Sequence, residues 1–103
     1  AKGGSIPPGT AKIMAFYVYM LKCINDGVNK TYVGYTNNVQ SRLCKHNKNK
    51  GAKSTRGYTW KVIYKRYFKS KSNAMTYEYK LKNNKKKRSQ ILKNEKNFSL
   101  TSL

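Results

Sequence analysis

The sequence predicts a small α/β domain, for three reasons. Three segments are rich in the aromatic and β-branched residues that favour strands: residues 16–23, 30–36 and 60–68. Two further segments, residues 38–46 and 73–83, carry apolar side chains at helical spacing. The chain has 103 residues, a length typical of one domain with a modest hydrophobic core.

Residues 1–13, AKGGSIPPGTAKI, differ from the rest of the chain because they are rich in Gly and Pro and lack periodicity. We interpret them as an expression tag or disordered leader and place the start of the folded domain at residue 14. The alternative is a native arm that contacts nucleic acid.

The first two strand segments are separated by Asp26 and Gly27, a pair typical of turns. They are therefore predicted to form an antiparallel hairpin. Gly34 lies inside the second strand segment. Because glycine weakens a strand, it indicates either a bulge or the close approach of another group.

The first helix is predicted to begin after Asn38, whose side-chain oxygen can accept a hydrogen bond from an amide of the first turn. One face of this helix then carries Val39, Arg42, Leu43 and His46. Arg42 and His46 are therefore expected on the side that packs against the rest of the domain. That position is unusual for an arginine that is merely solvated.

Residues 47–59 are polar, basic and Gly-containing, which predicts a loop. The third strand follows, although its apolar alternation is imperfect. Ser72 is then predicted to cap the second helix. The inward face of that helix is expected to carry Ala74, Tyr77, Glu78 and Leu81.

The end of the chain is basic, and a third, short helix is expected around Ile91 and Leu92. We interpret residues 96–103 as a C-terminal tail, which leaves residues 14–95 as the folded domain.

The charge of the chain indicates a polyanionic partner. Lys and Arg number 23 against three acidic residues, for a net charge of +20, and such a charge repels itself in the compact state. DNA is the predicted partner and RNA is possible, because the nucleic-acid backbone is a dense polyanion. No apolar run is long enough to cross a bilayer.

The cysteines, Cys23 and Cys44, form neither a CxxC pair nor a zinc-binding spacing. We interpret the chain as a reduced intracellular protein, cytoplasmic or nucleoid-associated if it is bacterial.

Glu78 stands out among the three acids. Asp26 is explained by its turn, and Glu95 lies among lysines like a surface charge. Glu78 lies on the inward face of a helix, where a bare carboxylate is costly and needs a partner. A basic side chain would serve, and so would Mg²⁺, which proteins often hold through only one or two carboxylates.

Two tripeptides resemble the motifs that give the GIY-YIG nucleases their name: YVY at residues 17–19 and YVG at residues 32–34. Tyr17 stands where the name has glycine, a departure shared by many small members. The loop KGAKSTRG is similar to one in small single-domain bacterial-type members. The resemblance covers residues 16–93 and extends to the nuclease domain of structure-selective flap endonucleases.

The resemblance also places functional residues and a fold. Arg42, His46 and Glu78 fall where the family has its helix arginine, a histidine one turn later and a metal-binding glutamate. The fold implied is a three-stranded antiparallel sheet flanked by helices. The activity implied is divalent-metal-dependent hydrolysis of DNA phosphodiesters, with branched or nicked DNA as possible substrates.

The chemistry gives each catalytic residue a role. Arg42 can bind the extra negative charge of the pentavalent phosphate through its planar fork. Glu78 would hold a single Mg²⁺ or Mn²⁺. The general base stays open among Tyr19, Tyr32 and His46, because free tyrosine has a pKa near 10 and needs assistance.

Four further residues are predicted to contact nucleic acid: Lys53, Thr55 and Arg56 in the basic loop, and Lys80 on the second helix. Two other functions stay open beside the nuclease. One is a catalytically weak nucleic-acid-binding module of the same fold, and the other is a basic RNA-associated structural protein.

Overall fold

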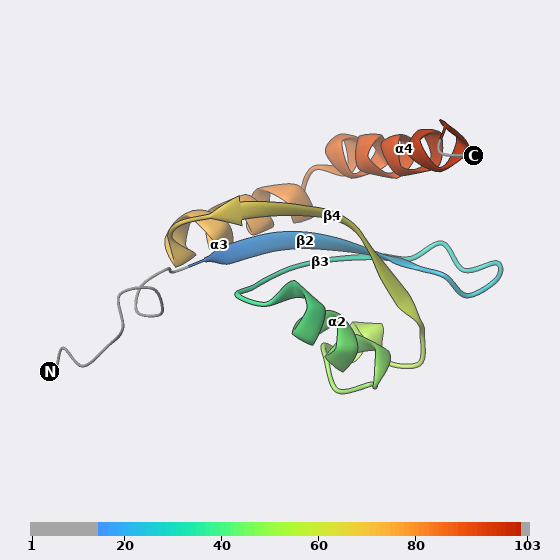
Figure 1. The fold of residues 1–103 in the computed structure, drawn as a ribbon, viewed down its shortest axis with the longest axis horizontal. Helices are drawn as coiled ribbons and strands as arrows, with labels where there is room; N and C mark the ends of the chain where they lie inside the picture. Colours follow the sequence, from blue (N-terminus) through green and yellow to red (C-terminus); the bar gives the residue numbers. More distant parts are fainter. Residues whose placement is uncertain (1–14, 102–103) are drawn as a thin grey trace, which may run out of the picture.

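The computed structural model describes the backbone of residues 15–101 and the side chains as far as Glu95. The predicted leader lies outside the described residues. The elements follow one another as β2 (Phe16–Cys23), β3 (Thr31–Thr36), α2 (Val39–Asn47), the 3₁₀ turn η1 (Lys53–Thr55), β4 (Trp60–Phe68), α3 (Lys71–Lys82) and α4 (Lys85–Thr101) (Figure 1).

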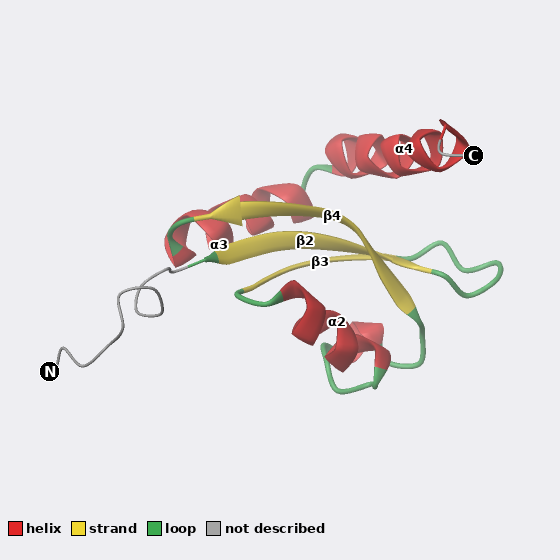
Figure 2. Cartoon of the chain, viewed as in Figure 1, coloured by secondary structure: helices red, strands yellow, loops and turns green. Residues whose placement is uncertain are grey.

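The strands form one antiparallel sheet in the order β3-β2-β4, which confirms the predicted α/β fold with a three-stranded antiparallel sheet. β2 is the central strand, and β3 lies at one edge. The sheet lies between α2 on one side and α3 with α4 on the other (Figure 2).

Two hydrophobic cores form on the two faces of the sheet because successive side chains of β2 point in opposite directions. Val18 and Met20 pack with side chains of α3 and α4. Tyr19 and Leu21 pack on the other face, with Val39 of α2. Tyr19 therefore lies on the face that carries α2.

A bulge in β4 explains the imperfect alternation of its sequence. Met20 pairs with Tyr64 while Leu21 pairs with Val62, so Ile63 is an extra residue on β4. Beyond this residue the side chains of β4 change faces relative to a regular strand.

The helix starts agree with the sequence at one position and differ at another. Asn38 caps α2 as predicted, since its Oδ1 accepts from the Ser41 amide at 3.0 Å. The cap of α3 is Ser70, whose Oγ accepts from the Asn73 amide at 3.1 Å, and not Ser72. The prediction was wrong by two residues because β4 ends at Phe68, which leaves Ser70 in the extended conformation that a cap needs.

Two segments contain more helix than the sequence indicated. The predicted loop contains η1, and the short third helix is α4, with 17 residues that continue beyond position 95 to Thr101. Ile91 is buried against the core of the sheet, which gives this basic helix its contact with the domain. No helix in the described part of the chain is long and apolar enough to cross a membrane.

The two cysteines are not bonded to each other. Cys23 is buried on β2, and Cys44 is exposed on α2.

Candidate active site

A cleft of about 390 Å³ lies at β3 and gathers four of the predicted catalytic residues. They come from four different elements: Tyr19 from β2, Tyr32 from β3, Arg42 from α2 and Glu78 from α3. Because α2 and α3 lie on opposite sides of the sheet, the cleft brings a cation and a carboxylate together across β3.

Gly34 makes this arrangement possible. It pairs directly with Tyr19 in the sheet. A Cβ atom at position 34 would lie 2.7 Å from the hydroxyl oxygen of Tyr19 and 3.0 Å from the ring of Tyr32. The group whose approach the glycine indicated is therefore the Tyr19 side chain, which lies across β3 and reaches beyond it.

His46 is 1% exposed and lies behind Tyr19, outside the lining of the cleft. Its Nε2 is 2.9 Å from the hydroxyl oxygen of Tyr19, and its Nδ1 is 2.8 Å from Oγ1 of Thr55. The ring also packs closely against Gly51, where a Cβ atom would collide with it.

The hydrogen bonds around His46 set its tautomer. The Thr55 hydroxyl donates its one proton to the carbonyl of Ala52 at 2.8 Å. It must therefore accept from Nδ1–H of His46, which leaves Nε2 unprotonated. Tyr19 then donates to Nε2 of His46 and keeps the lone pairs of its oxygen free to accept a proton.

The surroundings keep both partners neutral at neutral pH. Burial lowers the pKa of His46, and the nearby charge of Arg42 lowers it further. Burial also raises the pKa of Tyr19, to which Tyr32 adds, while the charge of Arg42 acts in the opposite direction. A free imidazolium or phenolate is thus disfavoured in this pair.

Glu78 lies in the cleft, and its side chain is 16% exposed. Its carboxylate forms an ion pair with Lys82, one turn later on α3, at 3.0 Å. Its environment therefore contains the basic partner that the sequence left as one alternative. No group of three or more His, Cys, Asp or Glu side chains occurs among the described residues. One carboxylate facing an open polar cleft fits a Mg²⁺ ion that completes its shell with water and substrate phosphate.

The four predicted nucleic-acid contacts do not line this cleft. Lys53 and Arg56 are exposed beside η1, and Lys80 is exposed on α3, almost opposite Glu78 on the helix. Thr55 is fully buried, and its hydroxyl is hydrogen-bonded to His46, so its side chain is not exposed for the predicted contact with nucleic acid.

Lys71, which was not among the predicted site residues, also lines the cleft. It precedes Glu78 by seven residues, a spacing that places two side chains on one helix face. This spacing was the available signal, but the predicted helix started at residue 73 and left Lys71 outside it.

Comparison with known proteins relates the chain to one catalytic domain. The model of the family described as the GIY-YIG catalytic domain matches residues 15–95. A UPF0213 protein of Oceanobacillus iheyensis is 46% identical over 67 residues, which cover 64% of this chain and 74% of the relative. A UPF0213 protein of Staphylococcus haemolyticus is also 46% identical over 67 residues, covering 64% and 78%.

A solved structure is similar as well. The solution NMR structure of a UPF0213 protein from Bacillus halodurans is 36% identical, and the match covers 79% of this chain and 84% of that chain, with a TM-score of 0.46.

Proposed function

The chain belongs to the GIY-YIG catalytic domain family, and from this premise we propose that it is a divalent-metal-dependent endonuclease that hydrolyses DNA phosphodiesters. The observation that carries the proposal is the cleft at β3, where Arg42 and Glu78 meet beside two tyrosines. Branched or nicked DNA is the proposed substrate. The similarity to flap endonucleases stays a prediction.

Arg42 supplies the positive charge that the transition state needs. Hydrolysis passes through a pentavalent phosphate with more negative charge than the substrate, and a guanidinium binds two of its oxygens at once. Arg42 is half-buried in the cleft, so its charge is screened less than that of a lysine in solvent.

Glu78 is the residue that would hold the cation, with water and phosphate oxygens as the other ligands. When bound, a divalent cation polarises the phosphate and stabilises the leaving oxygen. Lys82 neutralises Glu78 in the structure, so its ammonium would have to leave the carboxylate for a cation to bind there.

Tyr19 and His46 together form the proposed base. The hydroxyl oxygen of Tyr19 accepts a proton from the attacking water while its own proton passes to Nε2 of His46. Such a relay forms no free phenolate, which suits a tyrosine whose pKa is raised by burial. It leaves His46 as an imidazolium, and because burial lowers the pKa of His46 this cation gives up its proton readily and is short-lived. Thr55 is a positioning residue, because its hydrogen bond to Nδ1 fixes the tautomer.

The second candidate is a catalytically weak nucleic-acid-binding module. The ion pair between Glu78 and Lys82 favours it, since a carboxylate already neutralised by lysine needs no metal. A basic RNA-associated structural protein would use the same surface charge without the cleft.

A nuclease assay separates these functions. Purified protein is incubated with duplex, nicked, flap and junction DNA and with a matched RNA, in EDTA, Mg²⁺ or Mn²⁺. We expect DNA cleavage only with metal and its loss in Arg42→Ala. Tight binding with no cleavage in any metal would favour the binding module, and a preference for intact RNA would favour the structural protein.

A further inference from the structure

Two basic side chains lie at the C-terminal end of α3: Lys82, which is next to the candidate metal ligand Glu78, and Arg88, which is held by the last carbonyls of the helix. Lys82 reaches Glu78 with its ammonium at 3.0 Å. The carbonyl of Lys82 accepts a hydrogen bond from the Arg88 guanidinium, which also donates to the carbonyl of Leu81 at 2.9 Å. The Arg88 side chain is thus anchored at both carbonyls, one helical turn from Glu78.

A second hollow continues from the catalytic cleft along β3. It measures about 330 Å³, and its lining includes Tyr32, Lys82 and Arg88. Tyr32 also lines the catalytic cleft, so the two hollows are adjacent.

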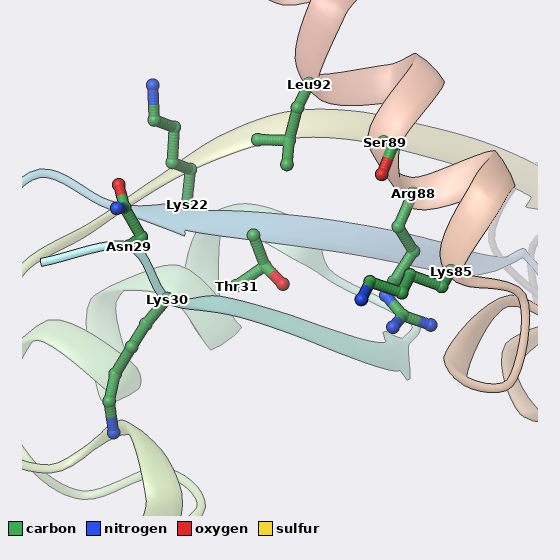
Figure 3. A pocket seen from close by; sticks show the side chains of 8 residues that line it. All are labelled: Lys22, Asn29, Lys30, Thr31, Lys85, Arg88, Ser89 and Leu92. Atoms are coloured by element: carbon green, nitrogen blue, oxygen red, sulfur yellow. The ribbon is translucent and has the colours of Figure 1, made fainter.

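A third hollow, of about 210 Å³, extends the path to α4. It shares Thr31 and Arg88 with the second hollow. Figure 3 shows Lys85 and Arg88 projecting from α4 toward Thr31 on β3. Together Thr31, Lys82, Lys85 and Arg88 define a path that we call the β3–α4 groove.

The charged side chains that line the two hollows of the β3–α4 groove are all basic, although Lys82 is paired with Glu78, which lines the catalytic cleft. Neither of its two hollows is lined by an Asp or Glu side chain among the described residues. Lys85 and Arg88 are spaced by three positions, so they share one face of α4. Because the Arg88 fork is already held in place, binding a phosphate there costs little side-chain entropy.

We propose that the β3–α4 groove binds the backbone phosphates of the substrate strand on one side of the scissile phosphate. DNA would then leave the cleft toward α4. This inference rests on the proposed function for the position of the scissile phosphate, but the groove itself is testable by binding alone.

The test compares two neighbouring lysines of α4. Lys85 lines the groove, whereas Lys86 is exposed one position later and lines neither hollow. Both lie in the first helical turn, so Lys85→Gln and Lys86→Gln change the net charge and the helix dipole interaction equally. Binding of a fluorescein-labelled duplex is measured by anisotropy in EDTA, from low to physiological salt, so that no cleavage occurs.

Each phosphate contact contributes about −0.9 to the slope of log K against log salt on B-DNA. Lys85→Gln should lower the magnitude of the slope by about 0.9, and Lys86→Gln should leave it unchanged. Equal slopes for Lys85→Gln and Lys86→Gln would overturn the proposal that the groove binds phosphate, because the two lysines would then contribute only to the general positive charge of the surface.

The outcomes for the groove and for the nuclease are distinct. A wild-type protein that gives the expected slopes but cuts DNA with no metal supports the groove and overturns the proposed function. If the wild type cuts DNA with metal but Lys85→Gln and Lys86→Gln bind DNA with the same salt dependence, the proposed function stands and the proposed phosphate binding in the groove is overturned.

Discussion

Replacing Glu78 with glutamine distinguishes a metal ligand from the partner of a salt bridge. Glutamine keeps the shape of the side chain and an oxygen that accepts from Lys82, but it lacks the charge that binds a hard cation. An ion pair at this helical spacing contributes about 0.3–0.5 kcal/mol. For a domain of this size, that energy corresponds to a decrease in Tm of about 1–4 °C.

The expected effect on cleavage is far larger than the effect on stability. Two unit charges about 4 Å apart interact by about 4 kcal/mol at an effective dielectric constant near 20. Losing that attraction for the cation corresponds to about a thousandfold loss in rate at limiting Mg²⁺. DNA binding should hold or become tighter, because a negative charge near the phosphate has been removed.

Thermal melting and cleavage across a Mg²⁺ titration measure both effects on one preparation. Lys82→Gln is the matched control, because it breaks the same ion pair and keeps the carboxylate. At saturating DNA it should cut at lower Mg²⁺ than the wild type. If Glu78→Gln has a much lower Tm and its remaining activity keeps the wild-type metal dependence, Glu78 has a structural role and its assignment as a metal ligand is refuted.

Three other predictions concern the residues around Tyr19. Arg42→Lys should lose most cleavage yet bind DNA nearly as well, because a point charge does not reproduce paired donors; parallel losses in anisotropy and cleavage assays would make Arg42 an ordinary phosphate contact. Gly34→Ala should lower the free energy of unfolding, measured in urea, by about 1–3 kcal/mol and reduce cleavage, because the new Cβ would lie only 2.7 Å from the Tyr19 hydroxyl oxygen and would displace it. A variant with unchanged stability and rate would contradict this packing. The folded-state pKa of His46 lies below its ordinary value of 6.5, so the stability it contributes is complete above that pH. As the pH falls below 6.5, the free energy of unfolding should decrease by up to about 1.4 kcal/mol per unit until the lowered pKa is reached, a slope absent from His46→Gln.

The strands and the first helix were predictable because their determinants are local. Aromatic and β-branched residues define β2 and β4 with the same bounds in sequence and structure. Asn38 is a strong cap that stands directly before the first apolar residue of its helix, Val39. Ser70 and Ser72 compete for the same helix start, and the choice depends on where β4 ends, which the helical pattern alone does not contain.

Motif spacing indicated which residues belong to the candidate site, but not which of them line the cleft and which lie behind it. The sequence placed Arg42 and His46 on one helix face, whereas the structure puts Arg42 in the cleft and His46 behind Tyr19. The partner of His46 on its Nδ1 side is Thr55, nine residues away across a loop. A hydrogen bond between two loop-separated side chains leaves no periodic signal, so Thr55 resembled a solvent-facing residue of a basic loop.

The position of Glu78 along the chain has a consequence for biosynthesis. Tyr19, Tyr32 and Arg42 all precede β4, while Glu78 follows it on α3. Since α3 packs on the sheet through Ala74 and Leu81, it can dock only when that sheet exists. Under the proposed function, a chain still leaving the ribosome is basic enough to attract nucleic acid, but the carboxylate that would bind the catalytic cation is not yet in the site. Cleavage activity would thus begin only when α3 has docked and the fold is complete.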